Sequence, residues 1–140
     1  MTNVTTGPGL ARRLAGPVLV LGAVGAGVAL AGVVDPNEPG HYPSCPLLWA
    51  TGLYCPGCGT LRLLHALAHG RPDVAFGLNP LVFVLLPVFG YLWARWTLRS
   101  ARGLPMASRL LRPGPAYALV AVVLVFWVLR NLPFAAALAP

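Results

Sequence analysis

Three long apolar stretches dominate this chain of 140 residues and limit what it can fold into. They cover residues 14–34, 80–96 and 115–134, and the last is apolar to Leu129 and extendable beyond Arg130. A helix needs roughly 20 apolar residues to cross a bilayer. Only 9% of the residues are charged, whereas a soluble domain carries about 25%. We therefore predict an all-α, single-domain integral membrane protein with three transmembrane helices.

The distribution of charge predicts how the chain is oriented. The net charge is +7, and every basic residue is an arginine. Seven arginines precede the first stretch or lie around the connection between the second and third: Arg12, Arg13, Arg95, Arg99, Arg102, Arg109 and Arg112. All acidic residues lie between the first two stretches: Asp35, Glu38 and Asp73. Because basic residues stay on the cytoplasmic side, we expect residues 1–13 and 97–114 inside and 35–79 outside. This pattern explains the basic excess without a nucleic-acid partner.

The first stretch has a second interpretation, as a cleaved signal peptide covering residues 1–31. Arg12 and Arg13 precede its apolar run, and Ala29-Leu30-Ala31 resembles a cleavage site. The run is longer than the usual 7–15 residues of a signal core, which favours an uncleaved anchor. Its many glycines and alanines are typical of close helix packing, against this protein's own spans or another membrane subunit.

The external segment is predicted to contain two short helices that lie at the membrane interface or re-enter it. Residues 41–57 contain several prolines and are expected to be irregular. A helix over 59–69 ends at Gly70, and a second helix over 74–78 is capped by Asp73. Asn79 and Pro80 begin the second span, with Asn79 expected to cap it or to bond the loop backbone.

The external segment also carries the residues best suited to chemistry. The run is Cys55-Pro56-Gly57-Cys58-Gly59-Thr60-Leu61-Arg62, with Cys45 ten residues before Cys55. On a helix, the spacing i, i+4, i+7, i+11 places Cys58, Arg62, His65 and His69 on one face.

Three interpretations of this face remain open. The cysteines with His65 and His69 suit zinc, copper or iron, although Arg62 would repel a cation. Alternatively, Cys55 and Cys58 form a redox dithiol, with a helix N-terminus and Arg62 lowering the pKa of Cys58. The sequence around these two cysteines has no strand–helix–strand pattern, which is the context that makes such a motif typical of thioredoxin-like oxidoreductases. In the third interpretation, Cys45 pairs with Cys55 or Cys58 in a disulfide that contributes about 2–3 kcal/mol. Arg62 itself is suited to lipid headgroups or to the carbonyls of the loop.

The chain resembles the DUF2752 family of small bacterial membrane proteins of unknown function. The resemblance covers roughly residues 43–90 and rests on the cysteine run, on His65 and His69-Gly70, and on Asn79-Pro80. The family often has Thr-Arg where this chain has Leu61-Arg62. The resemblance implies a membrane location, here the bacterial inner membrane, and no activity, substrate or cofactor.

Few groups suited to catalysis are present. The sequence has no paired carboxylates, no serine–histidine–acid set and no glycine-rich phosphate loop. We therefore expect an accessory or assembly protein rather than an enzyme. Its external Cys/Arg/His face either stabilises the segment structurally or binds a ligand or a partner protein. The alternatives are a thiol–disulfide oxidoreductase and a metal-binding membrane protein. A transporter ranks last, because the spans lack internal acids and bases.

Overall fold

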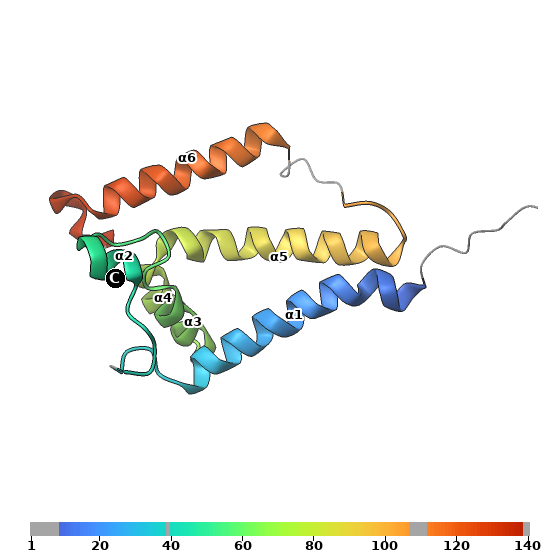
Figure 1. Cartoon of the computed structure of the whole chain (residues 1–140), viewed down its shortest axis with the longest axis horizontal. Helices are drawn as coiled ribbons and strands as arrows, with labels where there is room; N and C mark the ends of the chain where they lie inside the picture. The colour runs from blue at the N-terminus through green and yellow to red at the C-terminus, as the bar shows by residue number, and fades with distance from the viewer. Residues whose placement is uncertain (1–8, 39, 107–111, 139–140) are drawn as a thin grey trace, which may run out of the picture.

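The computed structural model describes residues 9–38, 40–106 and 112–138, and over these ranges the chain is helical with no strand. Its three long helices are α1 (Leu10–Val33), α5 (Pro80–Ala101) and α6 (Pro113–Arg130). Each is long and apolar enough to cross a membrane, which confirms the predicted fold class. The short helices are α2 (Pro46–Thr51), α3 (Thr60–Ala68), α4 (Pro72–Leu78) and the 3-10 helix η2 (Pro133–Leu138). Figure 1 shows α2, α3 and α4 gathered at one end of the long helices.

The long helices extend differently from the predicted spans. α1 begins at Leu10 and takes in the two arginines expected in the tail, while α5 continues to Ala101. Arginine is a good helix former whose charged end can reach the interface, so a helix continues past its apolar stretch. α6 ends at Arg130 rather than continuing to residue 134. Pro133 lacks an amide hydrogen and disfavours helical geometry at Leu132. Residues 1–8 of the expected tail and 107–111 of the basic loop lie outside the described residues.

The segment between α1 and α5, which was predicted to be external, is more helical than expected. Residues 46–51 form α2 where irregular structure was expected, because Pro46 stands at the first helical position, which needs no amide donor. α4 begins at Pro72, so Asp73 lies in its first turn and the cap is Arg71 instead. Gly70 follows α3 with a φ of 68°, the left-handed geometry that ends a helix.

A small core joins the short helices to the spans. Leu63 and Ala66 of α3 and Ala75 of α4 are buried, with Phe83 and Leu86 of α5 packed against them. α1 reaches this core through a glycine: a Cβ on Gly32 would lie 3.2 Å from Cβ of Ala68. The absence of a side chain there allows α3 to pack closely against the end of α1.

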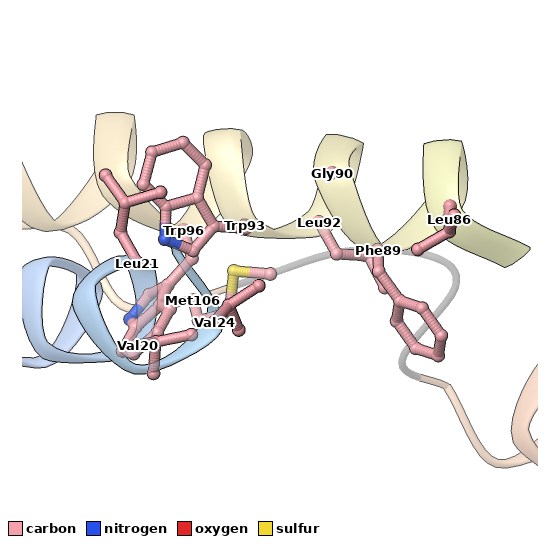
Figure 2. Close-up of a pocket in the computed structure, with 10 residues that line it drawn as sticks. All are labelled: Val20, Leu21, Val24, Leu86, Phe89, Gly90, Leu92, Trp93, Trp96 and Met106. Carbon is pink, nitrogen blue, oxygen red and sulfur yellow. The ribbon is translucent and has the colours of Figure 1, made fainter. Parts of the chain in front are cut away.

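Other parts of the long helices are apolar and exposed. Gly22, Gly25 and Gly27 in the middle of α1 have no atom within 4 Å of where a Cβ would stand, so these small residues pack against no other described part of the chain. Between α1 and α5 lies a cavity of about 890 Å³. Figure 2 shows its apolar lining, with Val20 and Leu21 from α1 and Trp93 and Trp96 from α5. Such a surface suits lipid chains.

Candidate metal centre

The three cysteines, which are separated in the sequence, meet in space. One ligand atom each from Cys45, Cys55 and Cys58 lies within 4.8 Å of the others. Sγ of Cys55 is 3.1 Å from Sγ of Cys58, and all three thiols are free and partly buried. Three sulphurs at this spacing form a potential site for one metal ion.

Local backbone geometry produces this convergence. The amide of Cys58 donates to the carbonyl of Cys55 at 3.1 Å, which closes a tight turn over Pro56 and Gly57. Gly59 then adopts a φ of 85° and caps α3, a conformation that other residues rarely adopt. On the other side, Cys45 caps α2, and Gly52, with a φ of 72°, ends α2 and lets the chain return toward Cys55.

Two side chains, Arg130 at the end of α6 and Asn79 at the N-cap of α5, donate hydrogen bonds to the carbonyls of this turn. Nη1 of Arg130 donates to the carbonyls of Cys55 at 3.2 Å, Pro56 at 3.4 Å and Cys58 at 3.2 Å. Nδ2 of Asn79 donates to Pro56 at 2.9 Å and Cys58 at 3.1 Å. Its Oδ1 accepts from the amide of Val82, so Asn79 both caps α5 and bonds the loop, the two roles between which the sequence left a choice.

Asn131 continues the attachment of α6 to the loop. Its Oδ1 accepts from the amide of Tyr54 at 2.8 Å, and its Nδ2 donates to the carbonyl of the same residue at 2.9 Å. Arg130 and Asn131 together therefore fix the end of the third span to residues 54–58.

Arg130 is the functional residue that sequence reasoning missed. It was regarded only as a point beyond which the third span could extend, although an arginine inside an apolar run is itself a signal of function. Its side chain is 2% exposed. The guanidinium carbon lies 5.1 Å from the ring centroid of Phe126 and 6.0 Å from that of Tyr54. Among the described residues, its Nε and Nη2 have no hydrogen-bond partner, and no carboxylate pairs with it. A buried cation of this kind calls for nearby negative charge.

The pKa of Cys58 differs from what the redox interpretation requires. That interpretation expected a lowered pKa, but burial raises the pKa of Cys58 to about 12, and hydrogen bonding with the Cys55 thiol adds to the rise. Cys58 lies before the αL residue Gly59 and so outside α3, where the helix N-terminus does not govern it. The amide of Leu48, with smaller contributions from the other two thiols, lowers the pKa of Cys45 to about 7.

The histidines do not join the cysteines. Nδ1 of His65 bonds the carbonyl of Ala31 at 2.8 Å, and its Nε2 lies 3.9 Å from Oδ1 of Asp35. Nδ1 of His69 bonds the carbonyl of His65 at 2.9 Å. Arg62 and His65 lie on α3 and His69 is its C-cap, but Cys58 does not share their helical face, because helical spacing does not extend back through Gly59.

Arg62 lies beside the cysteines but not on the loop carbonyls, which Arg130 occupies instead. It lines a cavity of about 590 Å³ together with all three cysteines. Glu38 is the other charged residue in that lining among the described residues, and its Oε2 is 3.4 Å from Nδ1 of His41. The cysteine sulphurs thus stand at the wall of an open, partly polar cavity.

Comparison with known proteins supports the resemblance seen in the sequence. Residues 45–93 match the model of the family described as "Protein of unknown function (DUF2752)", which confirms the resemblance over the segment that carries all three cysteines, Arg62 and Asn79. No curated protein and no solved structure matches the chain. Arg130 lies outside the matched segment.

Proposed function

We propose that this protein binds one thiophilic divalent metal ion, of which zinc is the type, through the sulphurs of Cys45, Cys55 and Cys58. The observation that carries this proposal is the convergence of the three sulphurs within 4.8 Å. Thiolates are the preferred ligands of zinc and other soft metals. Of the roles considered from the sequence, metal binding is the one that uses every cysteine.

The spacing suits a tetrahedral ion. Three sulphurs on one zinc lie about 3.8 Å apart, given Zn–S bonds of ~2.3 Å. The sulphurs here lie within 4.8 Å, with one pair at 3.1 Å, so side-chain shifts of about 1 Å or less would form the site. A tetrahedral ion held by these three cysteines would have one coordination position left for another ligand, and all three cysteines line the same cavity.

Charge supports the same proposal. A divalent ion with three thiolates carries one net negative charge, and Arg130 carries one positive charge. Arg130 is buried beside the carbonyls of two of the ligand residues and lacks a carboxylate partner among the described residues. Burying a charge without compensation is costly, so an anionic metal–thiolate group would satisfy this arginine.

The same features weigh against the redox alternative. A Cys55–Cys58 dithiol leaves Cys45 without a role, although one ligand atom from each of the three cysteines lies within 4.8 Å of the others. The site offers an open coordination position rather than acid–base groups, which favours a binding or accessory role over an enzymatic one.

The proposed location is the outer face of the bacterial inner membrane. The start of α1 and the C-terminal end of α5 lie together, at the end opposite α2, α3 and α4 (Figure 1). Arg12 and Arg13 lie in the first turn of α1, Arg99 lies in the last turn of α5, and Arg102 caps α5. By contrast, Glu38 lines the cavity of the cysteines, Asp35 lies 3.9 Å from His65 of α3, and Asp73 lies in α4. Because basic residues stay on the cytoplasmic side, this arrangement supports an external position for the cysteine end.

Co²⁺ binding to the reduced protein in detergent micelles tests the proposal. We expect one equivalent of Co²⁺ to give the intense absorption of sulphur-to-cobalt charge transfer, and Zn²⁺ to displace it. Cys45→Ser, Cys55→Ser and Cys58→Ser should each weaken binding strongly, whereas His69→Ala, outside the cluster, should not. Stoichiometric binding that survives replacement of all three cysteines would refute the proposal, as would failure of the reduced protein to bind either metal.

A further inference from the structure

The cavity beside the cysteines has a second recognition element besides the proposed metal. Arg62 lines it at the start of α3, one turn after the cysteine motif. Its side chain is partly buried and forms no hydrogen bond or ion pair with residues 9–38, 40–106 and 112–138, the part of the chain that the structure describes. The guanidinium of an arginine that lines a cavity is suited to bind a carboxylate through two parallel hydrogen bonds.

The acidic residue of the cavity lining and the nearby loop carbonyls have other partners, so Arg62 is available to bind an anion. Glu38, the acidic residue of the lining, has its carboxylate 3.4 Å from His41. The loop carbonyls that could have bound Arg62 are occupied by Arg130 and Asn79. An anion that enters the cavity would therefore find a cation without a competing partner among these groups.

From this arrangement we infer that the cavity takes a small thiol that carries a carboxylate: its sulphur fills the open metal position and its carboxylate binds Arg62. This rests on the proposed function. A soft metal held by thiolates accepts a further sulphur ligand. The thiol binds as a thiolate and releases its proton to solvent, and no electrons are transferred. A cavity of about 590 Å³ falls within the ~300–1,000 Å³ of small-molecule sites.

The test titrates Co²⁺-loaded protein with mercaptoacetate and 3-mercaptopropionate, which differ in length, and with 2-mercaptoethanol, which lacks the carboxylate. Each ligand that reaches the metal changes the charge-transfer absorption. We expect the better-fitting mercaptocarboxylate to bind about tenfold more tightly than 2-mercaptoethanol, because one charge-assisted contact is gained. Arg62→Met should remove this preference and leave 2-mercaptoethanol binding unchanged. Arg71→Met is the matched control, since Arg71 is exposed and outside the cavity lining.

The outcomes separate this inference from the proposed function. Equal affinities for the charged and neutral thiols, or a preference that survives Arg62→Met, would overturn the role of Arg62. A cobalt spectrum with three cysteine ligands that no thiol alters would show that the fourth position is closed, which overturns the inference while the metal site stands. Failure of Co²⁺ to bind refutes both.

Discussion

Replacing Arg130 with methionine tests the electrostatic argument at its centre, because the expected effects differ between the metal-free and the metal-bound protein. The substitution removes a side chain that is 2% exposed and donates to three loop carbonyls. Each carbonyl keeps another partner: Asn79 donates to those of Pro56 and Cys58, and the amide of Cys58 donates to that of Cys55. The loss of hydrogen bonding is therefore small, about 1–2 kcal/mol.

In the metal-free protein, the lost hydrogen bonding is offset because the substitution also removes a buried positive charge. Exchanging buried ionic groups for apolar ones of similar volume is often neutral or stabilising, by about 1–4 kcal/mol. We therefore expect the melting temperature of metal-free Arg130→Met in micelles to be close to that of the unmodified protein.

The metal-bound protein should respond differently. Opposite unit charges about 6–8 Å apart attract by about 2–3 kcal/mol at an effective dielectric constant of ~20. Without the guanidinium, the anionic metal–thiolate group loses this attraction, so the affinity for Zn²⁺ should fall about 30- to 150-fold. Arg130→Lys should retain part of it, since lysine keeps the charge but cannot reproduce the planar guanidinium.

Competition with a chromophoric chelator measures the Zn²⁺ affinity, and thermal unfolding with and without metal separates the two effects. Unchanged Zn²⁺ affinity in a folded Arg130→Met protein would refute the counter-charge argument. Equal destabilisation of both forms would show instead that Arg130 acts only as a structural clamp on the loop.

Three further predictions concern the loop and the orientation of the chain. Gly59→Ala should destabilise the protein by about 1 kcal/mol and weaken metal binding, because Gly59 has a φ of 85°. Gly57→Ala, whose Cβ would meet only Sγ of Cys55 at 3.8 Å, should be milder, and the reverse order in chemical denaturation would contradict the turn geometry. Asn79→Ala should lower stability by about 1–3 kcal/mol by thermal unfolding, since buried carbonyls and the α5 cap lose their partner; an unchanged melting temperature would count against this bonding. In a cysteine-free chain, a membrane-impermeant maleimide should label Asn37→Cys but not Ser100→Cys in intact cells, and the opposite pattern would invert the proposed orientation.

The family resemblance locates the cysteine segment but leaves the third span unexplained, because the matched residues end at position 93. The contacts of Arg130 and Asn131 with residues 54–58 show how that span belongs to the same site. In Figure 1 the C-terminal end of α6 lies at the same end of the molecule as α2, and the rest of the helix stands away from α1. The clamp on the loop is thus a principal attachment of the third span.

The sequence by itself determined the membrane-helical class, because the length and apolarity of a segment decide whether it can span a bilayer. It also located the turn that holds Cys55 and Cys58, since glycine and proline act locally on the backbone. The sequence could not show that Cys45 lies close to Cys55 and Cys58, or that His65 bonds the carbonyl of Ala31 instead. Nor could it show that Arg130, rather than Arg62, donates to the loop carbonyls. These pairings join residues distant in the chain, and helical periodicity carries no information about them. Only the packing of α6 against the folded loop brought the buried arginine to the carbonyls of Cys55 and Cys58, and with it the positive charge on which the proposed metal site rests.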